Sequence, residues 1–242
     1  KQCFLCLSPL TLEDQKDPRY KLGTSCPYCF KTPEALRVET VKQRNEAIQK
    51  ISHPLPGSTP YDNYRPLKVP ESYDGQHLLE FVSSIFPHVP KEHWEKECQL
   101  GRFLTNERQV ITKEYLVKKG ERLLHLSPMN SEPNVNANIQ VLYEDEAVIV
   151  INKPAPLPMH PCGRFNRNTL QYILNSVYAP AIPRPAHRLD AATSGLVVFA
   201  KSKHFAGKLQ PQFNEGKVKK TYFAKVQGHP EWETYTCELS IS

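Results

Sequence analysis

The middle of the chain carries a helical hydrophobic pattern followed by short extended runs. Apolar side chains recur at helical spacing at Leu78, Leu79, Phe81, Val82 and Ile85. The prolines within residues 87–90 end this helix, and a second helix is predicted over 91–100. Two extended runs follow at 102–104 and 123–126. These elements predict a compact unit over residues 73–130.

After residue 131 the pattern changes to short strands. Apolar runs at 141–143 and 147–152 are joined by the acidic turn 144–146, which is typical of a β-hairpin. A helix follows, for which Asn168 or Thr169 can serve as the N-cap. Its apolar positions fall on one face at Leu170, Ile173, Leu174 and Val177.

The last part of the chain continues this alternation. We expect a buried strand at 196–200, a helix at 205–213 closed by Gly216, and further strands at 221–226 and 236–241. Mixed short strands and helices predict an α+β domain over residues 131–242.

The pattern is weakest before residue 73. Residues 33–50 are highly charged, with only a faint helical stripe, and indicate an exposed helix or a linker. The following segment contains Pro54, Pro56, Pro60, Pro66 and Pro70. Because proline fixes φ and lacks a backbone donor, it excludes regular helix there. We therefore expect a semi-rigid linker over residues 33–72.

Charge and length restrict the class of protein only loosely. The 242 residues carry a formal charge of +6, a mild excess that favours polyanionic partners without identifying one. No apolar run approaches the roughly 18 residues of a membrane helix, so we expect no membrane partner. The chain begins at Lys1 and stops at Ser242 inside a predicted strand, and we expect it to be a piece of a longer product.

The seven cysteines do not suggest a secreted disulfide framework. Four of them form two close pairs, Cys3 with Cys6 and Cys26 with Cys29. Thiolates on two tight turns at this spacing can enclose a tetrahedral metal, so residues 1–32 predict a zinc-ribbon-like segment with structural zinc. The alternative is a segment of reduced, unliganded thiols. In either case a reducing, intracellular compartment is expected, either the cytoplasm or an organelle.

Candidate chemistry concentrates in the segment from His187 to Leu196, which reads HRLDAATSGL. If this segment is extended, Arg188 and Asp190 project to the same face. An ion pair there would keep Asp190 ionised in a partly buried pocket. The alternative is a surface aspartate that caps a turn before Thr193.

This segment resembles the signature of RluA-type RNA pseudouridine synthases. Further blocks occur in the family's order, at 148–154, at 158–163 and at 168–170, and they are most similar to the eukaryotic branch. The resemblance implies a mixed, largely antiparallel catalytic domain over residues 131–242, of which this is the N-terminal part. It also implies isomerisation of uridine in structured RNA without a cofactor for catalysis, with Asp190 as the catalytic carboxylate.

The resemblance assigns roles to further residues. Residues 219–222 are similar to the family's Lys-x-Tyr element, which implies that Tyr222 packs on the target base and helps to move protons; a core strand aromatic is the alternative. Arg188 would occupy the space of a flipped nucleotide. Arg164 and Lys220 are candidates for contacts with RNA phosphates.

The compact unit at 73–130 resembles the small alpha-L RNA-binding domain, an α+β module that precedes the catalytic domain in many such synthases. Its Arg102 and Lys113 would contact phosphates, unless the module serves packing alone. The expected partner is tRNA or ribosomal RNA, the latter within a ribosome or its precursor. The competing interpretation is a non-catalytic RNA-binding or ribosome-assembly subunit that retains the synthase fold.

Overall fold

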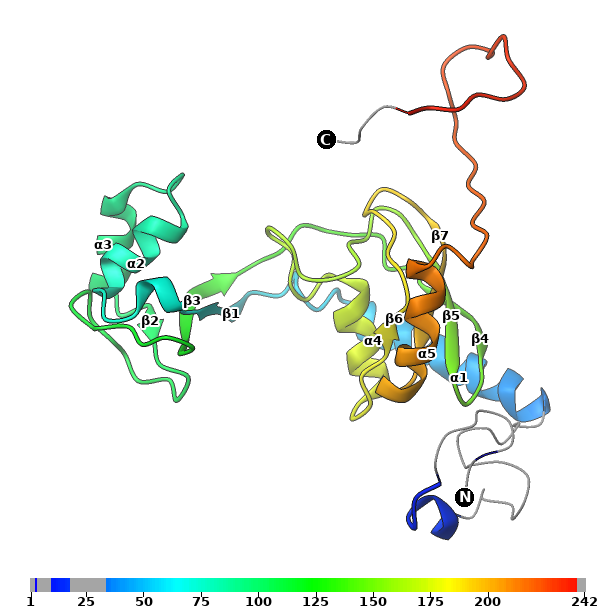
Figure 1. Ribbon diagram of the computed structural model, residues 1–242, viewed down its shortest axis with the longest axis horizontal. Helices are drawn as coiled ribbons and strands as arrows, with labels where there is room; N and C mark the ends of the chain where they lie inside the picture. Colours follow the sequence, from blue (N-terminus) through cyan, green and yellow to red (C-terminus); the bar gives the residue numbers. More distant parts are fainter. Residues whose placement is uncertain (1–2, 4–9, 18–33, 239–242) are drawn as a thin grey trace.

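The computed structural model describes residues 3, 10–17 and 34–238, and these residues form two modules connected side by side (Figure 1). The small module spans residues 61–130. The large module combines residues 131–216 with the helix α1 (Glu34–Ser52). Two short 3-10 helices, η1 (Asp14–Lys16) and η3 (Glu71–Tyr73), complete the elements before residue 78.

The small module packs two helices on a three-stranded antiparallel sheet. The strands are β1 (Tyr61–Lys68), β2 (Phe103–Leu104) and β3 (Arg122–Asn130), in the order β1-β3-β2. The helices α2 (Leu78–Ile85) and α3 (Lys91–Gln99) begin and end within about one residue of the expected limits. Their apolar faces bury Phe81 and Trp94 against Phe103 and Leu123 of the sheet. The amphipathic pattern therefore located this core correctly.

The expectation of a linker is wrong for the last part of residues 33–72. Residues 61–68 form β1, which pairs antiparallel with β3 across a separation of about 60 residues. Pro66 is tolerated because β1 is an edge strand, where a missing backbone donor costs no sheet hydrogen bond. The module therefore begins at Tyr61, before the predicted boundary at residue 73.

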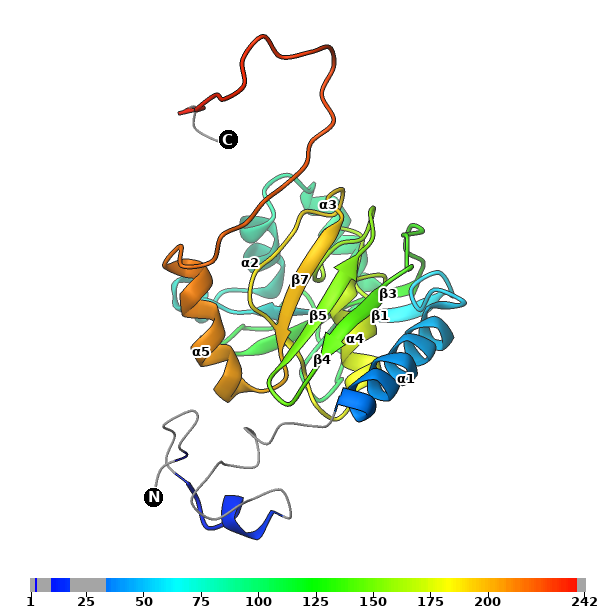
Figure 2. The same ribbon diagram turned by 90° about the vertical axis from the view of Figure 1, so that its right-hand side faces the viewer.

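The large module is built on a four-stranded antiparallel sheet, shown face-on in Figure 2. Its strands are β4 (Gln140–Glu144), β5 (Val148–Lys153), β6 (Arg184–Pro185) and β7 (Gly195–Ala200), in the order β4-β5-β7-β6. The predicted hairpin of β4 and β5 is confirmed. Ile149 and Ile151 lie opposite Phe199 and Val197 of β7, and all four side chains are fully buried.

Helix α1 covers the β4 edge of this sheet (Figure 2). The Asn45 side chain accepts a hydrogen bond from the Val141 backbone N–H (2.7 Å) and donates one to the Val141 carbonyl (3.1 Å), as a neighbouring strand would. Ile48 is fully buried in the large module's core. Residues 34–52 are thus part of the large module, and polar contacts at an open strand edge explain why their apolar stripe is weak.

Helices α4 (Leu170–Tyr178) and α5 (Lys203–Asn214) complete the large module and confirm two sequence predictions. The Thr169 hydroxyl caps α4 by accepting from the Tyr172 backbone N–H at 3.3 Å. Ser202 caps α5 in the same way through Phe205. No helix in the described ranges is long and apolar enough to cross a membrane.

Residues 217–238 contain no regular helix or strand and extend away from the large module (Figure 1). The strand predicted at 221–226 is therefore absent. A β-strand requires a partner for its backbone hydrogen bonds, and among the described residues no strand lies beside this segment. The strand expected at 236–241 extends beyond the described residues, and its part up to residue 238 is not a strand either.

Candidate active site

The Asp190 loop (residues 186–194) connects β6 to β7. Leu189 is buried in the large module's core, whereas Arg188 and Asp190 on either side of it are exposed. The Asp190 carbonyl accepts a hydrogen bond from the Thr193 backbone N–H at 3.1 Å, which closes the turn. Alternating burial thus turns both polar side chains outward.

The expected environment of Asp190 differs in two respects. The part of the chain that the structure describes contains no salt bridge between Arg188 and Asp190. The Asp190 carboxylate is exposed rather than partly buried, so water solvates it.

A fully buried lysine supports the Asp190 loop from beneath. The Lys153 ammonium donates hydrogen bonds to the carbonyls of Leu157 (2.8 Å), Pro154 (3.0 Å) and Ala191 (3.3 Å). Burial lowers the pKa of Lys153, and the nearby negative charge of Asp190 acts in the opposite direction. The Leu157 backbone N–H also donates to the Ala191 carbonyl at 2.9 Å. These bonds fix the backbone of the residue next to Asp190.

Sequence reasoning did not single out Lys153, although a signal was available. In β5 the buried positions alternate through Ile149, Ile151 and Lys153. A lysine in phase with two core isoleucines must find buried acceptors, because an unpaired charge in a core is strongly destabilising. This requirement points to a lysine with a structural partner nearby.

A cavity of about 680 Å³ adjoins the Asp190 loop. Residues 192–196 form one wall, and residues 218–223 form another, so Lys220 and Tyr222 reach the same cavity as Thr193 and Ser194. Asp190 itself does not line it, although its neighbours Leu189 and Ala192 do. The structure therefore brings Tyr222 and Lys220 to the neighbourhood of the Asp190 loop.

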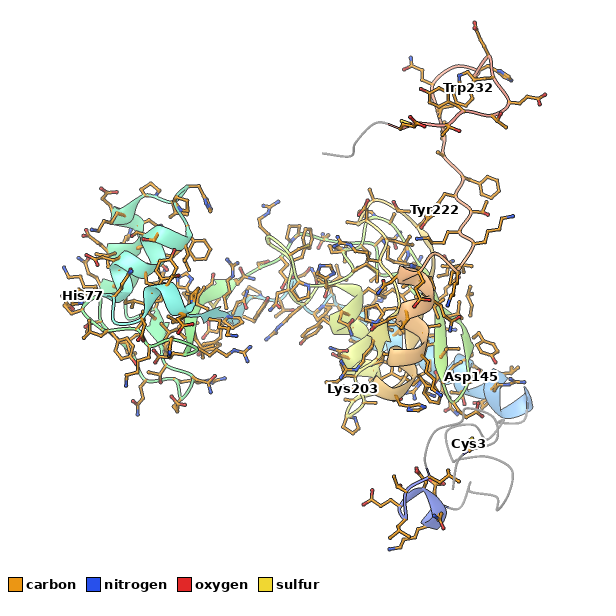
Figure 3. The ribbon with its side chains drawn as sticks, viewed as in Figure 1. Cys3, His77, Asp145, Lys203, Tyr222 and Trp232 are labelled. Atoms are coloured by element: carbon orange, nitrogen blue, oxygen red, sulfur yellow. The ribbon has the colours of Figure 1, made fainter. Side chains whose placement is uncertain are left out.

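Tyr222 is held only loosely at this cavity. Its side chain is 58% exposed and lies on the extended segment that leaves the large module (Figure 3). The next residue, Phe223, is 100% exposed. Tyr222 is thus not a strand aromatic in a core here.

His187 also lines this cavity. Its ring stacks on Phe213 with centroids 4.6 Å apart. Burial lowers the pKa of His187, and the Val198 backbone N–H donates to Nε2 at 3.3 Å, so the neutral ring carries its proton on Nδ1. In the described parts of the chain Nδ1 has no hydrogen-bond partner.

The remaining RNA-binding candidates occupy different places. Arg164 is exposed in the loop before α4, and Lys113 is half exposed beside Glu114. Arg102 donates to the buried Glu97 carboxylate at 2.6 Å, and His125 Nε2 lies 2.9 Å from the same carboxylate. The charge of Arg102 is therefore largely balanced by Glu97 inside the small module.

The proposed zinc ligands fall almost entirely outside the described residues. Cys3 is described and buried, whereas Cys6, Cys26 and Cys29 are not described. Within the ranges 10–17 and 34–238, and at residue 3, no cluster of three or more His, Cys, Asp or Glu side chains could hold a metal ion. The zinc site stays a prediction.

Comparison with known proteins supports the assignment of the large module. Residues 147–242 match the family model described as RNA pseudouridylate synthase. The chain is 32% identical to human pseudouridylate synthase RPUSD2, over 69% of this chain and 31% of that protein. It is 28% identical to the mitochondrial tRNA pseudouridine(32) synthase of Saccharomyces cerevisiae, over 84% of this chain and 46% of that protein. Likewise, it is 28% identical to the tRNA pseudouridine(31) synthase of the same yeast, over 70% and 46%.

Residues 147–242 are therefore similar in sequence to an RNA pseudouridylate synthase domain, and the three relatives named above are eukaryotic. The aligned part of the chain spans between 31% and 46% of the length of these three relatives.

Proposed function

We propose that the protein isomerises uridine to pseudouridine in structured RNA, with Asp190 as the catalytic carboxylate. The observation that carries this proposal is the anchored Asp190 loop: Lys153 and Leu157 hold its backbone through Ala191 while the carboxylate faces solvent. An exposed carboxylate on a fixed backbone can meet a nucleotide that is turned out of its helix.

The reaction explains why a carboxylate is needed. The bond between uracil nitrogen and ribose breaks, the base turns, and the ribose carbon is rejoined to ring carbon five, so substrate and product have the same atoms. A carboxylate can add to the ring, attack the sugar, or stabilise positive charge on the sugar while the base is detached. Asp190 is the carboxylate in the loop that resembles the family signature, and we assign it this role.

Two neighbours complete the proposed chemistry. Tyr222 would pack on the extruded uracil and help to transfer the proton that leaves ring carbon five. Arg188 would fill the space left by the flipped nucleotide. Arg188 is exposed in the Asp190 loop, and Tyr222 is exposed at the cavity beside that loop.

We propose tRNA as the favoured substrate and ribosomal RNA as the second. The support is that two yeast relatives are named tRNA pseudouridine(32) synthase and tRNA pseudouridine(31) synthase. One of these relatives is named as mitochondrial, so an organelle is one of the compartments to examine. Association with ribosomes is part of the ribosomal RNA alternative.

The small module and the N-terminal segment would assist binding. We propose that the small module contacts RNA as an alpha-L domain does, through exposed basic side chains such as Lys113. Cys3, Cys6, Cys26 and Cys29 would hold one structural zinc ion. Neither part is assigned a role in the chemical step.

The decisive test is Asp190→Asn in the full-length protein. This change keeps size and removes the negative charge, so pseudouridine formation on a tRNA transcript should fall to the background level. RNA affinity and its decrease with added salt should stay unchanged, because phosphate contacts supply much of the affinity. The matched control is Glu46→Gln, an exposed carboxylate on α1, which should convert uridine normally.

Normal conversion by Asp190→Asn would remove the catalytic assignment and favour the non-enzymatic RNA-binding alternative. Arg188→Ala should lower both the rate and the affinity, since Arg188 is proposed to contact the substrate.

A further inference from the structure

A groove between the two modules has no role in the chemistry proposed above. Residues 63–66 of β1 form one side and residues 161–166 of the large module form the other. Its cavity is about 240 Å³, which is smaller than the roughly 300 Å³ at which small-molecule pockets begin. The groove therefore suits part of a chain rather than a whole small molecule.

Glu132 fixes the two sides of the groove to each other. Its buried carboxylate accepts hydrogen bonds from the backbone N–H groups of Asn166 (2.9 Å), Arg167 (2.8 Å) and Asn168 (2.8 Å), and also from the Tyr61 hydroxyl. Burial alone would raise the pKa of Glu132, but these donors lower it below its ordinary value, so the carboxylate stays ionised. The ionised carboxylate thus ties β1 to the large module.

Further contacts reinforce this junction. The Asn166 amide donates to the Asn63 side chain at 3.2 Å, directly across the groove. The Gly57 backbone N–H donates to Asn168 Oδ1 at 2.7 Å, and a Cβ at Gly57 would lie 2.6 Å from the Glu132 carboxyl carbon. The chain approaches so closely here that only glycine fits. The contacts of the fold therefore hold the two sides of the groove in place.

A tight turn presents Arg164 at the rim of the groove. Cys162 and Phe165 exchange backbone hydrogen bonds of 3.0 and 2.9 Å, which leaves Gly163 and Arg164 at the tip. Gly163 has φ +52°, a conformation that glycine adopts without strain. The turn holds the Arg164 backbone opposite β1.

The groove is positively charged. Arg65 and Arg164 both line it and are exposed, and neither has a carboxylate within salt-bridge distance in the described ranges. Residues 63–66 and 161–166 include no acidic side chain. The nearby Asp62 carboxylate instead accepts from the Met129 backbone N–H at 3.2 Å.

The aromatic side chains of β1 are fixed by cations. The Arg108 guanidinium lies 4.6 Å from the centroid of the Tyr64 ring, and Arg167 lies 3.6 Å from that of Tyr61. Two further positive charges therefore stand beside the groove.

We propose that this groove binds the sugar–phosphate backbone of a single-stranded RNA segment, with Arg65 and Arg164 contacting phosphates. The proposal rests on the function proposed above, because it takes RNA as the substrate. Unpaired arginines on the two sides of a narrow groove match a phosphodiester chain, and a duplex is too wide to enter it. A peptide strand paired to the free edge of β1 is disfavoured, since Pro66 lacks a donor and the groove is cationic.

The test compares two double variants of the full-length protein. Arg65→Gln with Arg164→Gln removes the charges of the groove. Lys42→Gln with Lys50→Gln removes two exposed charges from α1 and serves as the matched control. Binding of a fluorescent, unmodified tRNA transcript is titrated at several salt concentrations, and thermal unfolding checks that both variants fold.

The groove variant should bind roughly tenfold more weakly at 0.1 M salt, and the slope of log affinity against log salt should fall by about 1.4, or about 0.7 per lost phosphate contact. The control should keep both the affinity and the slope of the unchanged protein. Unchanged binding by the groove variant, or an equal loss in the control, would overturn the proposal.

Two other outcomes distinguish an error in the proposed occupant of the groove from an error in the proposed activity. If the unchanged protein self-associates and only the groove variant abolishes this, without an effect on RNA, a protein strand occupies the groove and the RNA proposal is wrong. Pseudouridine formation is measured on the same transcripts. Loss of binding in the groove variant, combined with no pseudouridine from the unchanged protein, would support the groove while rejecting the proposed activity.

Discussion

The two walls of the candidate active site are held in different ways. The Asp190 loop lies over buried Leu189 and is bonded from beneath by Lys153, whereas residues 217–238 have no regular structure and leave Tyr222 58% exposed. The first wall is supported by the core of its own module. The second would need a partner for its backbone before Tyr222 could take a fixed position. A carboxylate on a supported backbone thus lies in the loop beside a cavity that an aromatic without such support lines.

The largest effect is expected from Lys153→Met, which removes the support of the first wall. The carbonyls of Leu157 and Ala191 would lose a charged donor, and we expect the free energy of unfolding of the large module to fall by roughly 2–4 kcal/mol. Pseudouridine formation should fall too, because the backbone beside Asp190 is no longer fixed. Chemical denaturation and a rate assay below the unfolding transition measure the two effects. Unfolding at an unchanged denaturant concentration would mean that Lys153 does not anchor the loop.

Tyr222→Phe tests the second wall. Loss of the hydroxyl should lower the rate of pseudouridine formation by about 100-fold, as is typical for loss of a group that transfers protons. The free energy of unfolding should change by less than about 0.5 kcal/mol, because the side chain is exposed. Phe223→Leu, at the fully exposed neighbouring position, is the control and should leave both quantities unchanged. A normal rate for Tyr222→Phe would show that the hydroxyl has no part in the reaction.

Glu132→Gln tests whether the junction between the two modules contributes to stability as the anchoring of the Asp190 loop does. Glutamine cannot accept the backbone donors as strongly, and we expect a loss of about 1–3 kcal/mol at pH 7. The pKa of Glu132 in the folded protein is below its ordinary value of 4.5. The stability that the ionised carboxylate contributes is therefore complete above pH 4.5. This contribution is lost as the pH falls through the lowered pKa.

Unfolding curves of Glu132→Gln and the unchanged protein should therefore converge as the pH is lowered below about 4.5. A difference that stays constant between pH 7 and pH 3 would contradict the role of the charge.

The smallest effect on the catalytic region should come from zinc removal. Metal analysis of the full-length protein should find one zinc ion, and chelation should unfold residues 1–30. The large module's free energy of unfolding should change by less than about 0.5 kcal/mol, since the described residues of its core lie after residue 40. Cys26→Ser should lose the metal with the same limited effect. Purified protein without zinc would remove this prediction.

Local patterns in the sequence were enough to predict much of the fold. Helices α2, α3 and α4 and the hairpin of β4 and β5 follow from apolar spacing and from Thr169 as a cap. The burial of Leu189 between exposed Arg188 and Asp190 follows from simple alternation.

Non-local contacts account for the failures. The strand β1 pairs with a segment about 60 residues away and carries Pro66, so its own residues gave no strand signal. Helix α1 meets a sheet edge through Asn45, a contact that apolar periodicity does not register. At 221–226 the residues favour a strand, but the described chain offers no partner.

The candidate site rests on the motif. Asp190, Lys220 and Tyr222 were predicted from it, and Lys220 and Tyr222 line the cavity beside the Asp190 loop. Lys153 was missed because its importance depends on carbonyls that only folding brings together.

Pseudouridine mapping in cells tests whether the protein forms pseudouridine through Asp190. RNA from cells lacking the protein is compared with RNA from the same cells supplied with the unchanged protein or with Asp190→Asn. We predict that at least one pseudouridine in tRNA or ribosomal RNA disappears, returns with the unchanged protein, and does not return with Asp190→Asn. Persistence of every pseudouridine in the depleted cells, or restoration by Asp190→Asn, would contradict the account.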